Sequence, residues 1–139
     1  MNDLFSNLVA PEITDHPLDT TATEELNVTL SCNATGNPVP TFSWTIDGSA
    51  VNTTADPRIS LSLENKQLTI TNVRKTDSGN QYRCVANNTI AIVTSNAATL
   101  TNILCKYYFS LFLFDVHAKV ARCSDVSRGA LSFLSIAIL

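Results

Sequence analysis

The sequence predicts an all-β fold, a two-layer sandwich of about seven to eight short strands. Between Ala10 and Thr101, apolar and polar residues alternate with a period of two, and turn residues interrupt the alternation. No stretch of useful length within this region shows the period of a helix. Each strand therefore has one apolar face, and a second packed sheet is the simplest way to cover it.

The first half of this region contains an opening segment and two clear strands. The opening segment lies near residues 11–13 and is broken at Pro17. The second strand directs these residues toward a core: Leu26, Val28, Leu30 and Cys32. Residues 36–40 (GNPVP) break the chain, a third strand follows over residues 42–46, and Asp47-Gly48 forms a turn.

The second half continues the pattern in four further strands. Their inward residues are Ile59, Leu61 and Leu63, then Leu68 and Ile70, then Tyr82, Cys84 and Ala86, and last Ala98 and Leu100. Asn102 stands where the last strand requires another apolar residue. We therefore expect a domain over residues 10–102, an N-terminal extension over 1–9, and a non-homologous or irregular tail over 103–139.

Composition excludes several classes of function. The chain has 139 residues, enough for one domain with a substantial core. The net charge is −3 and the nine Lys and Arg residues do not cluster, so no nucleic-acid partner is expected. Because no catalytic constellation, phosphate-binding glycine loop or metal-ligand spacing occurs, we expect no enzyme activity, cofactor, metal or small-molecule substrate.

The two ends of the chain carry no clear targeting signal. Residues 1–11 lack the basic region and the apolar stretch of a secretory signal peptide, which suggests either a fragment of a longer protein or a cytosolic chain. The apolar runs at 107–114 and 130–139 are each too short to span a bilayer. The tail is interpreted as non-homologous sequence, with a lipid-anchor signal or a genuine edge-covering segment as alternatives. Cys105 and Cys123 would then be free thiols or an optional second bridge.

Four residues at matched spacing carry a family resemblance. Cys32, Trp44 and Cys84 fall on the second, third and sixth strands in the inward phase, and Tyr82 precedes Cys84 by two residues. With the stretches LNVTLSCNATGNPVPTFSW, QLTITNVRKTDSG and YRCVANN, the chain resembles the immunoglobulin superfamily of the intermediate (I-set) type, as in hemicentin-like, neural-adhesion-like and receptor-ectodomain proteins. The resemblance covers about residues 10–101 and implies a Greek-key β-sandwich. It assigns this core signature: Trp44, Leu68, Asp77, Gly79 and Tyr82.

The resemblance implies two pairings. The first is a disulfide between Cys32 and Cys84, and the alternative is two free buried cysteines, as in cytosolic members of the muscle type. The second is a salt bridge between Arg58 and Asp77, and the alternative is two solvated charges.

Two departures from the family pattern affect loops. Asn80 and Gln81 stand between Gly79 and Tyr82, where the family usually has one residue, so we expect a small bulge before the sixth strand. The usual glycine near Ala91 is absent, which predicts a distorted turn or one moved back to residues 87–88.

Candidate sites for modification and binding lie at the surface. Four positions match the Asn-x-Ser/Thr pattern of N-glycosylation: Asn27, Asn33, Asn52 and Asn87. Three of them fall on outward strand positions, although about three such triplets are expected by chance in this composition. The candidate partner loop consists of Ile90, Ala91, Ile92 and Val93, which are apolar where polar residues are usual. The alternative is that these side chains fold back onto the core.

Three functions remain. The favoured one is an extracellular or cell-surface module for adhesion or matrix-protein recognition, part of a larger and membrane-anchored or secreted protein, binding protein partners homophilically or heterophilically. The first alternative is a ligand-binding segment of a receptor ectodomain of the kinase or phosphatase type. The second alternative is a cytosolic structural module.

Overall fold

The computed structural model describes residues 7–104, 107–109 and 119–121. Within the first range the elements are β1 (Val9–Asp15), β2 (Thr20–Thr23), β3 (Val28–Ser31), β4 (Asn33–Asn37), β5 (Thr41–Ile46), β6 (Ser49–Ala50), β7 (Ile59–Ser62), β8 (Gln67–Ile70), the 3₁₀ turn η1 (Lys75–Asp77), β9 (Gln81–Asn87), β10 (Ile92–Thr94) and β11 (Ala98–Leu104). The chain divides into two compact units, Met1–Ile103 and Leu104–Leu139.

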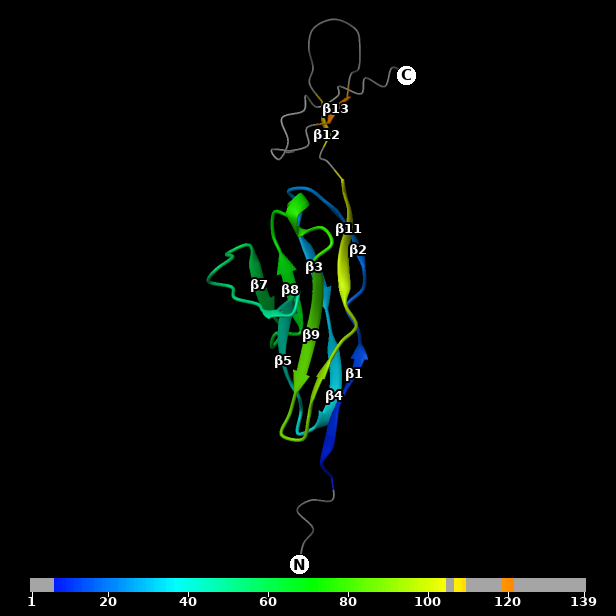
Figure 1. The fold of residues 1–139 in the computed structure, drawn as a ribbon, viewed down its shortest axis with the longest axis vertical. Coiled ribbons are helices and arrows are strands. Elements are labelled where there is room, and N and C mark those ends of the chain that lie inside the picture. The colour runs from blue at the N-terminus through cyan, green and yellow to red at the C-terminus, as the bar shows by residue number, and fades with distance from the viewer. Residues whose placement is uncertain (1–6, 105–106, 110–118, 122–139) are drawn as a thin grey trace, which may run out of the picture. The chain divides into compact units, whose positions relative to one another are not determined.

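The first unit is the predicted β-sandwich (Figure 1). One layer has the strand order β2-β11-β9-β5-β6, with β10 also paired to β9. The other layer has the order β3-β8-β7, and β1 pairs with β4 beside it. The all-β sandwich predicted from the alternation is therefore confirmed, as is the immunoglobulin-like class that the resemblance implies.

The strands are more numerous and shorter than the seven to eight expected, because two of the expected strands are interrupted and two short strands, β6 and β10, were not expected. The opening strand divides at Pro17, so that β1 pairs with β4 while β2 joins the opposite layer beside β11. The second strand divides at Cys32 into β3 and β4. β10 begins within the predicted partner loop and pairs with β9. Between β10 and β11, the Ser95 hydroxyl accepts a hydrogen bond from the Cys84 N–H at 2.9 Å. The expected last strand, β11, continues through Asn102 to Leu104, beyond the expected end.

The core follows the predicted inward phase with two exceptions. Trp44, Leu68, Tyr82, Cys84 and Leu100 are fully buried among the core side chains. Leu26 and Leu63, by contrast, are 50% and 65% exposed. Each lies just outside a strand, where the alternation of side chains no longer applies, and Leu63 has a positive φ of 51°.

The predicted turn at Asp47-Gly48 joins β5 to β6. Both residues have positive φ, 50° and 81°, the backbone of a tight type I′ hairpin. The Asp47 carboxylate also accepts the Gln81 N–H at 2.8 Å, which anchors this turn to the start of β9.

The second unit is described only at two short strands. β12 (Tyr107–Phe109) pairs antiparallel with β13 (Lys119–Ala121). Cys105, Cys123 and the apolar run 130–139 lie outside the described residues.

Candidate protein-binding surface

A disulfide joins the two layers beside the buried indole. Cys32 and Cys84 are bonded with their Cα atoms 6.3 Å apart, and both side chains are buried. Trp44 lies opposite Cys84 on the neighbouring strand, and its Nε1–H donates to the Asn65 carbonyl at 2.7 Å. The bridge closes a loop with a sequence separation of 52, a constraint worth about 4 kcal/mol in the chain-entropy account.

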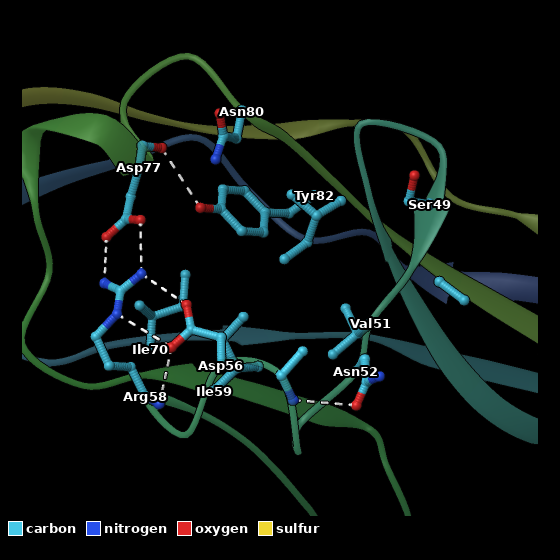
Figure 2. A pocket seen from close by; sticks show the side chains of 13 residues that line it. Ser49, Val51, Asn52, Asp56, Arg58, Ile59, Ile70, Asp77, Asn80 and Tyr82 are labelled. Carbon is cyan, nitrogen blue, oxygen red and sulfur yellow. Dashed lines mark hydrogen bonds and ion pairs between the residues drawn. The ribbon is translucent and has the colours of Figure 1, made fainter.

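Arg58 is held between two carboxylates at one end of the sandwich (Figure 2). Its Nη1 and Nη2 donate to the two oxygens of Asp77 at 2.8 and 3.1 Å, a bidentate pair. Its Nη2 and Nε donate to Asp56 at 2.7 and 3.2 Å. The hydrogen bonds to Asp77 above all raise the pKa of Arg58. Burial opposes ionisation of Asp56, but its hydrogen bonds with Arg58 outweigh this, and the pKa of Asp56 is lowered.

Tyr82 keeps its corner contact despite the extra residue before it. The hydroxyl donates to the Asp77 carbonyl at 3.4 Å, and Gly79 takes up the turn with a φ of 82°. Its N–H bonds the Leu100 carbonyl at 3.2 Å, so the lengthened turn is tied to β11. Burial and then the Asp77 charge raise the pKa of Tyr82 to about 12.

A cavity of about 300 Å³ adjoins this ion-pair cluster. Its apolar wall is formed by Ile46, Val51, Ile59, Ile70 and Tyr82, several of which are seen in Figure 2. Among the described residues, no buried side-chain nitrogen or oxygen lacks a hydrogen-bond partner. Part of the polar lining of the cavity belongs to the Arg58 cluster, whose groups pair with one another and stabilise the fold.

At the opposite end, Asn88 ties three chain segments together. Its Nδ2 donates to the carbonyls of Val9 and Pro38 at 2.8 and 3.0 Å. Its Oδ1 accepts the N–H groups of Ile90 and Ala91 at 2.9 and 3.1 Å. All four hydrogen-bonding positions of the amide are thus used, and the start of β1, the β4–β5 loop and the β9–β10 loop are fixed to one another.

Close packing makes Gly36 part of this arrangement. A Cβ at Gly36 would lie 3.1 Å from the Pro40 ring and 3.2 Å from the Asn88 amide nitrogen. A larger residue would therefore push the β4–β5 loop away from Asn88.

Exposed apolar side chains gather on the three segments that Asn88 joins. We call this set the apolar tip: Leu8, Val9, Val39, Ile90 and Ile92. Val39 is 77% exposed and Ile92 is 66% exposed. The three segments carry no charge, since no charged residue occurs between Glu25 and Asp47 or between Arg83 and Lys106, nor at residues 7–11.

The predicted partner loop is therefore divided in its roles. Ile90 and Ile92 are exposed at the tip, Ala91 is half-buried, and Val93 packs against the core. The expected distortion near Ala91 is absent, because no residue from 87 to 91 has a positive φ. The Asn88 side chain shapes the turn in place of a glycine.

All four N-glycosylation motifs are exposed. Asn27 precedes β3, Asn33 begins β4, and Asn52 lies in the loop after β6, where its Oδ1 accepts the Thr54 N–H at 3.0 Å. Asn87 lies on β9 directly opposite Ile92 on β10 and Thr41 on β5. Modification at Asn87 would therefore place a glycan beside the apolar tip.

Sequence reasoning missed Asn88, Leu8, Val9 and Val39. Asn88 forms contacts with residues 79 and 50 positions away, which no local pattern reveals. The long uncharged segments were visible in the sequence and would have been the best available signal. In the described part of the chain, no helix is long and apolar enough to cross a membrane, and no group of His, Cys, Asp or Glu could hold a metal ion.

A two-layer sandwich with an inter-sheet disulfide packed on a buried tryptophan defines an immunoglobulin-type domain. A family model described as "Immunoglobulin domain" matches residues 10–88. The chain belongs to the immunoglobulin domain family.

Curated relatives include adhesion molecules. The chain is 43% identical over 77 residues to Contactin-5 of Danio rerio, covering 55% of this chain and 7% of that protein. It is 33% identical over 97 residues to Neural cell adhesion molecule L1 of Takifugu rubripes, covering 66% of this chain and 8% of that protein. The chain thus spans less than a tenth of the length of these relatives.

Solved structures with the same fold include a receptor module and a titin domain. The N-terminal Ig1-2 module of the Drosophila receptor protein tyrosine phosphatase DLAR matches with a TM-score of 0.59 and 33% identity, covering 65% of this chain and 44% of that chain. Titin domain M7 matches with a TM-score of 0.58 and 30% identity, covering 68% of this chain and 96% of that chain.

Proposed function

We propose that this chain is an extracellular protein-recognition module of the adhesion type, which binds its partner through the apolar tip. The tip carries the proposal: it is the place where exposed apolar side chains from three segments are held in one arrangement by Asn88. An exposed apolar cluster on a rigid support is typical of protein-binding surfaces, because little entropy is lost on docking.

The disulfide and the glycosylation motifs support an extracellular location. A bridge between Cys32 and Cys84 persists in oxidising compartments, and four exposed Asn-x-Ser/Thr motifs are compatible with passage through the secretory pathway. The similarity to a relative named as a neural cell adhesion molecule also supports this location.

Binding to cells tests the recognition function. The full chain, produced behind a secretory leader, biotinylated and assembled on streptavidin, should stain the surface of animal cells. Val39→Asp should abolish the staining, because it places a charge in the tip, whereas Leu63→Asp should not, since Leu63 is also largely exposed but lies outside the tip. Staining no stronger than streptavidin alone, or equal with both variants, contradicts the proposal.

The DLAR match favours a second candidate, a segment of a receptor ectodomain. It uses the same surface, and a catalytic domain encoded downstream in the full-length transcript would distinguish it from an adhesion chain. A cytosolic structural role, as the titin match allows, instead requires reduced cysteines and no glycans. Thiol titration and digestion with peptide-N-glycosidase of the chain in its native cells separate that alternative from the other two.

A further inference from the structure

We infer that Asn52 can accept an N-glycan after the domain has folded. The other three motifs, at Asn27, Asn33 and Asn87, accept one only before their strands pair. This difference follows from the hydrogen bonds that each motif must give up in order to enter a transferase, and it does not depend on which partner the apolar tip binds.

Transfer of the glycan requires access to two groups of the motif. A bond forms between the asparagine Nδ2 and C1 of the first sugar, and Nδ2 loses one proton to solvent. The bond from C1 to the pyrophosphate of a lipid-linked oligosaccharide breaks, and its electron pair leaves with the pyrophosphate. The hydroxyl of the third residue is also part of the recognised motif. Both side chains must therefore leave their partners, which is easy when a loop opens and difficult when a sheet must open.

The motif at Asn52 is held by contacts within its own loop. This loop joins β6 to β7 and is exposed at residues 52–55. The Asn52 Oδ1 accepts the Thr54 hydroxyl and the N–H groups of Thr54 and Ala55, the latter two at 3.0 and 3.2 Å. These bonds use Oδ1 and not Nδ2, the atom that receives the sugar. The Asn52 carbonyl accepts the N–H groups of Ala55 and Asp56, so these contacts also stay inside the loop.

The motif at Asn27 is built into the β3-β8-β7 layer. The Asn27 Oδ1 accepts the N–H of Asn72 at 3.2 Å, across a sequence separation of 45. The hydroxyls of Thr29 and Thr69 are hydrogen-bonded at 2.9 Å, and the two residues lie opposite each other on β3 and β8. A transferase can therefore reach this motif only if β3 leaves the sheet.

The motifs at Asn33 and Asn87 also lie within paired strands. Asn33 and Thr35 lie on β4, and both pair with residues of β1. Asn87 lies on β9 between β5 and β10, and its carbonyl accepts the Thr41 hydroxyl at 3.2 Å. The middle residue of this motif, Asn88, is fixed by four hydrogen bonds to distant and local segments. Both motifs thus require paired strands to separate before modification.

The position of Asn52 gives the order of folding and modification a consequence. Asn52 lines the cavity together with Asp56 and Arg58, whose ion-pair cluster lies at the end of the sandwich opposite the apolar tip. A chain that folds first therefore carries its glycan away from the tip. A chain that is modified first can also carry a glycan at Asn87, directly opposite Ile92. The rate of folding relative to glycan transfer thus determines whether the tip is shielded.

Glycosylation in vitro of the full chain, purified from a bacterial periplasm with its disulfide formed, tests the inference. A eukaryotic oligosaccharyltransferase and a lipid-pyrophosphate-linked oligosaccharide are added to the folded chain and, in parallel, to reduced and alkylated chain whose Trp44 fluorescence shows that it is unfolded. Peptide mapping by mass spectrometry locates the glycans. We expect one glycan on the folded chain, at Asn52, and further glycans on the unfolded chain. Folding should change the initial rate at Asn52 less than about threefold and lower the rate at Asn27 at least about tenfold.

Two variants confirm the site. Asn52→Gln should leave the folded chain without a glycan, whereas Asn27→Gln, the matched control, should still receive one. The inference is overturned if the folded chain gains no glycan, or if it gains one at Asn27, Asn33 or Asn87 as fast as the unfolded chain does. It is also overturned if the unfolded chain accepts a glycan at Asn52 alone, because the local sequence and not the fold would then select the site.

Discussion

The side chain of Asp77 contributes to both ion pairing and backbone capping. It is 9% exposed, pairs with Arg58, and its Oδ2 accepts the Arg74 N–H at 2.8 Å. Removal of one partner of a buried pair costs more than the pair contributes, because the remaining charge loses its compensation. Residues such as Asp77 are therefore more sensitive to mutation than exposed carboxylates nearby.

The first prediction compares the two carboxylates that hold Arg58. Asp77→Ala should lower the free energy of unfolding by about 3 kcal/mol, because Arg58 and the Arg74 N–H both lose a buried acceptor. Asp56→Ala should have a much smaller effect, since water can reach its 34% exposed side chain. Urea denaturation followed by Trp44 fluorescence measures both. Equal losses in the two variants would contradict the account.

Tyr82 predicts a pH dependence on the alkaline side. Its pKa is raised to about 12 from a usual value of 10.0, so the folded state retains a proton that the unfolded state releases. Stability should therefore be constant below pH 10 with respect to this group and fall between pH 10 and about 12. In Tyr82→Phe, this part of the decline should disappear from the free energy of unfolding measured against pH. Parallel curves for the two proteins would show that another group is responsible.

At the scale of elements, the sequence predicts strands better than strand ends. The period-two pattern correctly placed Cys32, Trp44 and Cys84 inward, because a strand keeps its alternation as long as it remains paired. It failed at Leu26 and Leu63, where the backbone leaves the sheet. The break at Pro17 was predicted, but the pairing of β2 with β11 beyond it was not, because pairing depends on segments distant in the chain.

Asn88 joins the loops at the apolar tip into one unit, so we expect its removal to destabilise all of them together. Asn88→Ala should lower the free energy of unfolding by about 1–2 kcal/mol, since four hydrogen bonds are lost and water can replace only some of them at this partly exposed site. Amide hydrogen exchange should accelerate together at the β9–β10 loop and at β1. Asn87→Ala, the neighbouring and exposed position, serves as the control. Faster exchange in only one segment would mean that the loops are held independently.

At the scale of the whole molecule, the fold class and the disulfide could be predicted from sequence, whereas the tip could not. The signature residues are fixed by the packing of one core, and their spacing is therefore visible along the chain. The tip is assembled from residues near positions 8, 39 and 90, whose proximity exists only after folding. Its chemistry was thus present in the sequence, but its geometry was not.

The position of Asn87 beside Ile92 predicts that glycosylation regulates the tip. In chain secreted from glycosylating cells, Asn87→Gln should strengthen the staining of cells several-fold, because the glycan next to Ile92 is removed. Asn33→Gln, at the end of β4 farther from the tip, should have no such effect. Cell staining with both variants beside the native chain provides the measurement. A similar change in both would indicate that glycan bulk, and not its position, limits binding.

The Cys32–Cys84 bridge also determines how far the domain can lengthen when a force pulls its two ends apart. While the bond is intact, the segment between the two cysteines cannot extend under tension. With a sequence separation of 52 and about 3.3–3.6 Å per extended residue, oxidation shortens the unravelled molecule by about 17–19 nm. The domain then acts as a tether of limited extension, because only the segments outside the disulfide-closed loop can still extend.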